Sequence, residues 1–479
     1  MNQAVFRAWV ALVFAWQAFA HGFWLPISTH SGQTTIPWLM NQGRVLFGDV
    51  LEQHAPGSSL MAALAQRLLP TLALDDLVRG LDVLLVLALG LLIVRAALRL
   101  GGRTAAAWAL GFWVLWLPVF GNVMLYFNTL LALAALAAYS LGQGRWASMS
   151  GTRALSVGLL MGLATLFKQQ AWLGIILLGL VWAWQGAGWR RLAAYSLGVL
   201  VVPSLIVLVV ATQGNLDAYL YWNWTFNLSG QMESIFPSVN FVRKLGLACI
   251  LLLPFVLQTF QAEPEQRADR LTLLALLLSG LALIIPRAGE IQVTAGLPFL
   301  AVASGLALAT GLSKLRLRPL TIAQMDALPL GLLGGLALLS AWSGLVAYVP
   351  SPLGIGATLG YDEFWPVVEA LRPHQRPGDT LFVLPEADST PQIHPMTGLL
   401  PPGTWVKGWT WYLERTGMAE RLLAEWESQP PTFIIVFPAL YAGSRPGIDP
   451  LLAFTAAHYD EIARVEVYLH GEAIIYRRR

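Results

Sequence analysis

The chain has 479 residues, of which 56% are hydrophobic and only 12% carry a charge, and its mean hydropathy is +0.60. Soluble domains have roughly 45–50% apolar and about 25% charged residues, so this composition excludes an ordinary soluble protein. The net charge of +3 does not indicate a nucleic-acid partner, because the basic residues mostly occupy short loops between apolar segments. A single cysteine, Cys249, excludes an intrachain disulfide and a cysteine metal cluster.

Eleven apolar windows are long enough, or nearly so, to cross a bilayer, and they predict a polytopic α-helical membrane protein with about eleven transmembrane helices. The windows fall near residues 5–24, 80–98, 104–121, 124–142, 154–167, 171–185, 192–212, 245–260, 271–286, 293–311 and 327–349. The first resembles a signal peptide, but its length and its bulky Trp16 and Trp24 favour a retained helix. The windows at 154–167 and 171–185 are shorter than the roughly twenty residues of a perpendicular crossing, so we expect them to extend into polar residues or to cross only part of the bilayer.

Basic residues occupy alternate loops on one face of this arrangement. They are Arg95, Arg99, Arg103, Arg145, Arg153, Arg190, Arg191, Arg267, Arg270, Lys314, Arg316 and Arg318. The positive-inside rule assigns that face to the cytoplasm. An odd number of spans then places the N-terminus inside and the chain after Val349 outside, so we expect a multi-pass protein of the inner (plasma) membrane.

From Pro350 onward the run of apolar windows stops, and a small extracytoplasmic α/β domain is expected. Helices are predicted at 362–371, 414–427 and 451–459, strands at 380–385 and 432–437, and a hairpin at 462–468 and 472–476 that turns at His470-Gly471. The proline-rich stretch 385–402 predicts loops. The organisation is therefore a transmembrane domain at 1–349, with a long first outer loop at 25–58, and an outer domain at 350–479.

The first outer loop holds the best candidates for chemistry, because it gathers His30, Asp49, Glu52 and His54 beside the bilayer. Loops of this length without regular structure are usually functional. A carboxylate there can take a proton from a hydroxyl group, or bind a divalent ion such as Mg²⁺ or Mn²⁺. Asp49 and Glu52 would be ligands of such an ion, but no full ligand set is visible, so metal dependence stays open. Alternatively, both carboxylates cap or face a short interfacial helix in water.

Cations are scarce on the outer face, and those at span ends are candidates for binding an anionic substrate group. Lys168, with Gln169 beside it, follows the span at 154–167, Arg287 follows the span at 271–286, and Arg243 precedes the span at 245–260. The alternative is that these side chains reach lipid headgroups, as long basic side chains readily do, and we favour it for Arg243.

Two aromatic segments lie outside the predicted spans. Trp409 stands with Trp405, Lys407, Trp411 and Tyr412 in the C-terminal domain, where these residues form either a substrate-facing loop or part of the domain core. The loop at 213–240 carries Tyr219, Tyr221, Trp222, Trp224 and Phe226, which we interpret as a membrane-interface belt rather than as a sugar-stacking surface.

The segment from Gly43 to Gly57, with Phe47, Asp49 and Pro56, resembles the first periplasmic loop of the GT-C integral-membrane glycosyltransferases, notably the protein-mannosyltransferase and aminoarabinose-transferase-like group. That group often shows a Gly-x-x-Tyr-x-Asp stretch closing on a proline pair; this chain has Phe47 for the tyrosine and Ala55-Pro56 for the pair. The layout of spans, first loop and outer domain is similar too. The resemblance implies a cell-envelope enzyme that moves a sugar from a polyprenyl-phosphate donor to a hydroxyl of a glycan, lipid or protein acceptor, with inversion at the anomeric carbon.

One departure from the group bears on the catalytic base. Relatives commonly carry an Asp or an Asp-Glu pair after the first span, and the matching residues 28–33 hold no carboxylate. The resemblance therefore assigns the base to Asp49 first, and otherwise to Glu52 or His30, with Glu52 and His54 able to orient it. Lys168 and Arg287 would hold the donor phosphate.

Two other hypotheses remain open at this point: a lipid or solute transporter, and a catalytically inactive scaffold of the same fold. Transporters commonly show internal repeats and broken helices, which the sequence does not clearly have. A shared outer cavity that holds Asp49, Lys168 and Arg287 would favour sugar transfer.

Overall fold

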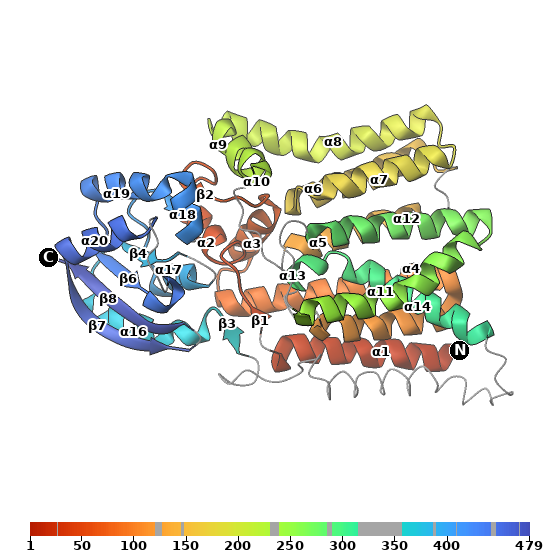
Figure 1. Ribbon diagram of the computed structural model, residues 1–479, viewed down its shortest axis with the longest axis horizontal. Helices are drawn as coiled ribbons and strands as arrows, with labels where there is room; N and C mark the ends of the chain where they lie inside the picture. The colour runs from red at the N-terminus through yellow and green to blue at the C-terminus, as the bar shows by residue number, and fades with distance from the viewer. Residues whose placement is uncertain are drawn as a thin grey trace. The chain divides into compact units, whose positions relative to one another are not determined.

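The computed structural model describes residues 1–25, 27–119, 127–144, 148–229, 239–284, 290–314, 357–386, 389–408, 410–441, 447–468 and 470–479. The chain divides into two compact units (Figure 1). Unit 1 comprises Met1–Leu25, Arg79–Val209 and Ser234–Pro350, and unit 2 comprises Pro26–Val78, Val210–Glu233 and Ser351–Arg479. The C-terminal region therefore folds together with the first long loop and with part of the loop at 213–240.

Unit 1 is helical and is built from the apolar windows. Its elements are α1 (Gln3–Phe19), the π-helical turn η1 (Ala20–Trp24), α4 (Leu74–Val119), α5 (Phe127–Gly142), α6 (Gly151–Phe167), α7 (Ala171–Trp184), α8 (Trp189–Thr212), α11 (Val239–Phe260), α12 (Pro264–Leu281), η3 (Ala282–Ile284), α13 (Glu290–Val293) and α14 (Leu297–Lys314). The expected spans at 80–98 and 104–121 form one run, α4, which breaks at Gly102, where φ is 73°. Glycine tolerates this φ because it has no Cβ. The window at 327–349 lies outside the described residues.

Four helices of the described chain are long and apolar enough to cross a membrane, at Gln3–Trp24, Leu74–Leu117, Trp189–Thr212 and Phe241–Phe260. Four more apolar helices are shorter, at Phe127–Gly142, Gly151–Phe167, Ala171–Trp184 and Leu297–Gly311. Leucines such as Leu200 and Leu208 on α8 are 51% and 59% exposed, as expected for side chains that face lipid rather than water. The short helices α6 and α7 agree with the short windows of the sequence.

Glycines bring α6 and α8 into close contact. A Cβ added to Gly158 would lie 2.1 Å from the carbonyl oxygen of Tyr195, and one added to Gly162 would lie 2.5 Å from that of Val199. Small residues four apart commonly allow helix backbones to approach within a membrane. This packing fixes α6, whose C-terminal cap is Lys168.

Unit 2 combines short loop elements with a compact α/β region. Its elements are β1 (Ile27–Ser28), α2 (Thr35–Asn41), β2 (Val50–Leu51), α3 (Gly57–Leu68), α9 (Leu216–Leu220), η2 (Tyr221–Thr225), α10 (Phe226–Leu228), β3 (Thr358–Leu359), η4 (Asp362–Phe364), α16 (Trp365–Leu371), η5 (Arg372–His374), β4 (Leu381–Leu384), η6 (Thr390–Gln392), α17 (Ile393–Thr397), β5 (Trp405–Val406), α18 (Thr410–Thr416), α19 (Met418–Ser428), β6 (Phe433–Val436), η7 (Pro438–Tyr441), α20 (Asp449–His458), β7 (Tyr459–Val467) and β8 (Gly471–Arg478).

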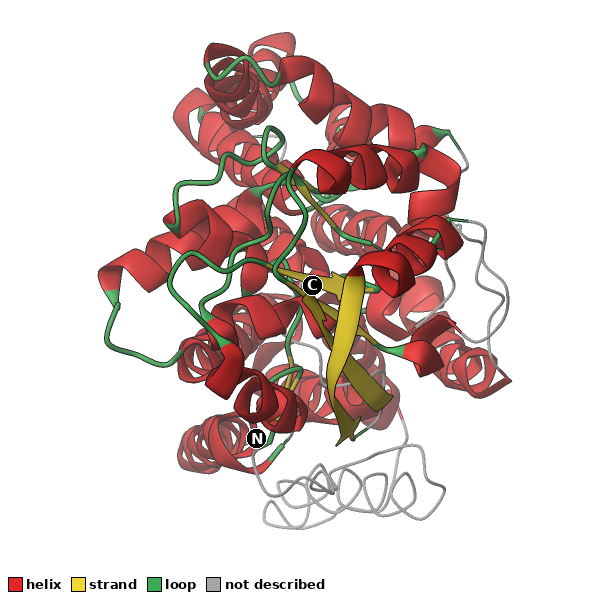
Figure 2. Cartoon of the chain, turned by 90° about the vertical axis from the view of Figure 1, so that its left-hand side faces the viewer, coloured by secondary structure: helices red, strands yellow, loops and turns green. Residues whose placement is uncertain are grey.

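A four-stranded sheet in the order β4-β6-β8-β7 forms the centre of this α/β region. Figure 2 draws strands in yellow and helices in red. Strands β4 and β6 are parallel, and β8 is antiparallel to both of its neighbours. Along β4, Leu381 and Val383 pack in one core with α16, whereas Phe382 and Leu384 pack in another with α19. Because successive side chains of a strand point to opposite faces, the continuous apolar run places helices on both sides of the sheet.

Two details of this region bear on the sequence predictions. The hairpin that turns at His470-Gly471 is confirmed by β7 and β8, and Gly471 has a positive φ of 71°. The single helix predicted at 414–427 is wrong, because the chain breaks at Gly417 into α18 and α19. Gly417 has a φ of 66°, which stops a right-handed helix and which glycine adopts at little cost.

Short parallel pairings hold the first long loop on the C-terminal region. Strand β1 pairs with β3, and β2 pairs with β5 in the register Val50↔Trp405 and Leu51↔Val406. Trp222 is 5% exposed and its ring stacks on Tyr412 at 5.2 Å between centroids. The membrane-belt interpretation is therefore wrong for Trp222, because its large apolar area completes the core of unit 2.

Candidate functional site

A tight turn precedes the candidate site and uses the Asp49 carboxylate. Asp49 Oδ2 accepts a hydrogen bond from Val45 N at 2.8 Å, and Asp49 N donates to the Val45 carbonyl at 2.8 Å. Phe47, within this turn, has a φ of 69°, is fully buried and packs edge-on against Tyr219. One oxygen of Asp49 therefore closes the turn that leads into β2.

Glu52 follows β2 and is the most buried carboxylate of the first loop, at 2% exposure. Its Oε1 accepts from His54 N at 3.0 Å and from the ring nitrogen Nδ1 of His54. Its Oε2 is buried and has no hydrogen-bond partner among the described residues. A buried carboxylate oxygen without a partner is costly, so a group that can donate to it would bind favourably there.

Lys407 reaches the same place from the C-terminal region. The parallel register of β2 with β5 brings the ends of the two strands together, so Lys407 and Glu52 leave them side by side. Lys407 is 4% exposed, and its Nζ contacts His30 Nε2. His30 Nδ1 accepts from Gly32 N at 3.0 Å, and its ring lies edge-on to the ring of His54 at 5.7 Å. We call His30, Glu52, His54 and Lys407 the Glu52 cluster.

The charges of the Glu52 cluster keep its carboxylate ionised. Burial alone would raise the pKa of Glu52, but the charge of His54, its hydrogen bonds and the charge of Lys407 outweigh burial and lower that pKa to about 2. Burial and the nearby charge of Glu52 raise the pKa of Tyr412 well above its ordinary value. At neutral pH the cluster therefore combines an anionic glutamate, a neutral phenol and basic nitrogens.

Unit 1 contains a buried lysine in a polar setting. Lys168 is 8% exposed, and its Nζ donates to Gln292 Oε1 at 3.3 Å. Asn128 Nδ2 lies 3.5 Å from the same oxygen. Gln169 follows Lys168 and is half-buried. Lys168 therefore lies in a buried polar setting that includes two amide side chains.

The other predicted site residues are distributed as follows. Arg243 is exposed on α11. Arg287 and Trp409 lie outside the described residues. Asp49 belongs to unit 2 and Lys168 to unit 1.

A metal site is not apparent in the described part of the chain, where no group of three or more His, Cys, Asp or Glu side chains is placed to hold an ion. One oxygen of Asp49 and one of Glu52 already accept hydrogen bonds within the loop. Binding of a divalent ion by Asp49 and Glu52 stays a prediction.

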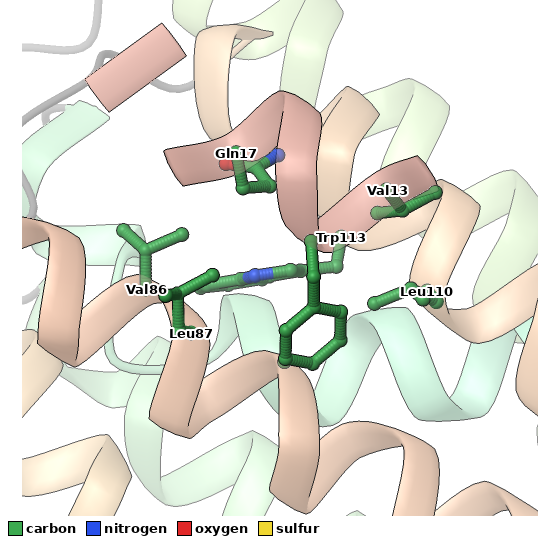
Figure 3. Close-up of a pocket in the computed structure, with 8 residues that line it drawn as sticks. Val13, Gln17, Val86, Leu87, Leu110 and Trp113 are labelled. Atoms are coloured by element: carbon green, nitrogen blue, oxygen red, sulfur yellow. The ribbon is translucent and has the colours of Figure 1, made fainter. Parts of the chain in front are cut away.

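A hollow in unit 1 has a different character (Figure 3). It is lined by Val13, Phe14, Gln17, Val86, Leu87, Gly90, Leu110 and Trp113. Gln17 is 3% exposed, and neither atom of its amide has a partner among the described residues. This lining holds no ionisable group, so the hollow offers nothing for acid–base chemistry.

Lys407 and the pair of Glu386 with His394 were not singled out from the sequence. Lys407 was predicted only as part of an aromatic segment, because the two-residue strand before it has no recognisable sequence pattern. Glu386 and His394, which form a fully buried pair, lie in the stretch predicted as proline-rich loops. No local pattern in that stretch indicates that the two side chains meet.

Comparison with known proteins identifies the fold. No family model and no curated protein matches the sequence. Among solved structures, the chain matches ArnT from Cupriavidus metallidurans bound to undecaprenyl phosphate with a TM-score of 0.65 at 15% identity, over 99% of this chain and 97% of that one. The chain therefore shares the fold of ArnT, which is of the GT-C type.

Two further structures support the same assignment. The archaeal oligosaccharyltransferase AglB from Archaeoglobus fulgidus, in complex with an inhibitory peptide and a dolichol-phosphate, matches with a TM-score of 0.54 at 11% identity over 99% of this chain and 74% of that one. The mycobacterial arabinofuranosyltransferase AftD matches with a TM-score of 0.52 at 15% identity over 100% of this chain and 42% of that one. At these identities the likeness establishes the fold and not the substrate.

Proposed function

We propose that the protein is a membrane glycosyltransferase that moves a sugar from a polyprenyl-phosphate donor to an acceptor hydroxyl, with inversion at the anomeric carbon. The GT-C fold supports this proposal, since ArnT and AglB were solved with polyprenyl phosphates bound. The observation that carries it is the Glu52 cluster, in which a buried carboxylate with an unpartnered oxygen orients a histidine next to a lysine. We further propose that the spans number about eleven and that unit 2 faces the outside.

The Glu52–His54 pair is suited to take the proton of the acceptor. Because Glu52 is ionised and accepts from His54 Nδ1, loss of the other ring proton leaves the lone pair of His54 on Nε2. A carboxylate that orients an imidazole in this way is the general-base arrangement found in many hydrolases and transferases. We therefore place the base at His54, with Glu52 as its orienting partner, rather than at Asp49, whose carboxylate closes the turn at Val45.

The reaction is a single displacement. The acceptor oxygen attacks the anomeric carbon, the bond from that carbon to the phosphate oxygen breaks, and the acceptor proton passes to His54. The leaving polyprenyl phosphate gains negative charge, which nearby cations stabilise in the transition state. Lys407 supplies such a charge in unit 2. Lys168, with Gln169 and Arg287, is the proposed phosphate-binding group of unit 1.

The experiment that tests the proposal measures sugar transfer directly. Purified protein receives radiolabelled polyprenyl-phosphate sugars and a membrane-lipid extract as acceptor, and released polyprenyl phosphate is measured with the transferred label. We expect product from the wild type and at least about a hundredfold less from His54→Gln, as for loss of a general base. Wild-type protein that releases no polyprenyl phosphate from any donor sugar would overturn the proposed function.

Two further variants separate the assignments of the base. Asp49→Asn keeps an oxygen for the Val45 hydrogen bond, so we expect a loss below about tenfold if His54 is the base. A loss at Asp49→Asn as large as that at His54→Gln would return the base to Asp49. The matched control is Glu427→Gln, an exposed glutamate on α19, which should keep wild-type activity.

A further inference from the structure

A second carboxylate–histidine pair lies next to the segment that carries Lys407. Glu386, His394 and Trp405 are each fully buried. Glu386 Oε1 accepts from His394 Nε2 at 2.6 Å and from Val383 N at 3.2 Å. Its Oε2 accepts from Trp405 Nε1 at 2.9 Å. Both carboxylate oxygens therefore have partners, in contrast to those of Glu52.

The pair is an ion pair rather than a neutral contact. His394 Nδ1 donates to the Leu399 carbonyl at 2.9 Å while Nε2 donates to Glu386, so the ring carries both of its protons. Burial alone would lower the pKa of His394, but the charge of Glu386 and the two hydrogen bonds raise it above its ordinary value. A fully buried charge of each sign is thus balanced within one contact.

Glu386 holds the Lys407 segment at both ends. On one side of Lys407, the indole of Trp405 donates to the Glu386 carboxylate. On the other side, Gly408 N donates to the Glu386 carbonyl at 2.8 Å, and a Cβ added to Gly408 would lie 3.3 Å from Glu386 Cβ. Trp405 N also donates to the Asp49 carbonyl at 2.8 Å, which ties the segment to the first loop.

We propose that Glu386, balanced by His394, is a positioning residue that fixes Lys407 beside Glu52 and so sets the affinity of the site for the phosphate of the lipid-linked donor. The inference rests on the proposed function. Its physical basis is that the carboxylate fixes the direction of the Trp405 indole N–H, which an apolar residue of equal volume would leave free to turn. Buried ion pairs can often be replaced by apolar residues without loss of stability, so the pair is better explained by geometry than by stability.

Two variants remove the hydrogen bond between Trp405 and Glu386, each from one side. The double variant Glu386→Leu/His394→Leu replaces the ion pair by apolar volume and should fold, whereas Trp405→Phe deletes only the indole N–H and part of the ring. The first measurement is the acylation of Lys407 by a small amine-reactive reagent, quantified by peptide mass spectrometry, which needs no catalytic activity. We expect Lys407 to react at least about fivefold faster in both variants, because a displaced lysine is less protected.

The second measurement separates substrate binding from chemistry. With the polyprenyl-phosphate sugar as donor, we expect KM to rise about tenfold in both variants, a larger change than any fall in kcat. A purely structural role would instead lower the fraction of active protein, and therefore kcat, with KM unchanged. If the double variant fails to fold, Trp405→Phe decides the question alone.

The matched control is Trp426→Phe. Trp426 is also fully buried in unit 2 and packs on Phe382 and Phe454, so it loses comparable volume without touching Glu386. It should leave both the labelling of Lys407 and KM unchanged. Unchanged labelling and unchanged KM in folded Trp405→Phe would overturn the inference. If Lys407 is labelled faster in the variants but the wild-type protein transfers no sugar, the positioning role stands and the proposed function is rejected.

Discussion

Glu52 and Glu386 are both buried glutamates of unit 2 bonded to a histidine, yet their surroundings differ. Glu386 uses both carboxylate oxygens, and its histidine uses both ring nitrogens. Glu52 leaves Oε2 without a partner among the described residues, and its histidine is 14% exposed rather than fully buried. A carboxylate with a partner at each oxygen is suited to hold structure, and one with an unpartnered oxygen is suited to meet a substrate.

The sharpest test of this comparison is to remove one partner of the Glu386–His394 pair. His394→Leu leaves the Glu386 carboxylate buried without its counter-charge, so we expect a loss of about 3–5 kcal/mol in the free energy of unfolding. The double variant Glu386→Leu/His394→Leu should recover most of that loss, because no buried charge remains. Thermal unfolding in detergent measures both. A double variant as unstable as the single one would mean that lost packing volume, and not the unpaired buried charge, lowers the free energy of unfolding.

A second prediction concerns Glu52 at acid pH. Its folded pKa of about 2 lies below the ordinary 4.5, so its stabilising contribution is fully present above about pH 4.5 and is lost as the pH falls through about 2. The shift corresponds to about 3 kcal/mol at most. Unfolding of wild type and Glu52→Gln should therefore differ most above pH 5 and converge towards pH 2. A constant difference across that range would contradict the lowered pKa.

For the Glu386–His394 pair we expect the opposite pH dependence of stability. The folded pKa of His394 is raised, so its contribution is fully present below about pH 6.5, the ordinary value for histidine, and is lost as the pH rises through the folded pKa. Wild type should lose stability on the alkaline side, and the double variant at Glu386 and His394 should lack that decline. The measurement is the unfolding temperature of both proteins above pH 6.5, with equal alkaline declines counting against the ion pair.

Much of the fold could be predicted from the sequence, because its signals are local. The apolar windows at 154–167 and 171–185 became helices of nearly those bounds, and continuous apolar runs became β4 and β6. The break at Gly417 was missed because one glycine within a charged helical pattern does not by itself reveal a positive φ. Trp222 was assigned to the membrane interface because Trp and Tyr gather there, and the sequence gives no sign of its packing on Tyr412.

The site could be predicted only in part. Glu52, His30 and His54 stood out because they lie close together in one polar loop. Lys407 joins them through the pairing of β2 with β5, and each of these strands has only two residues. Strands so short have no recognisable alternation, so the contact between loop and C-terminal region depends on tertiary structure that no local pattern encodes.

The smallest effect is expected at Gly408, where the comparison can be sharpened without changing any charge. A methyl group added by Gly408→Ala would lie 3.3 Å from Glu386 Cβ, so the backbone must shift slightly and we expect a loss of about 1 kcal/mol. Gly188→Ala is the control, because its added methyl meets nothing within 4 Å. If Glu386 acts through the position of Lys407, Gly408→Ala should raise KM for the lipid-linked donor more than its small loss of stability would suggest. Equal KM values in Gly408→Ala and Gly188→Ala would indicate that the segment carrying Lys407 tolerates displacement. The hydrogen bonds of Glu386 would then stabilise the domain core rather than position Lys407.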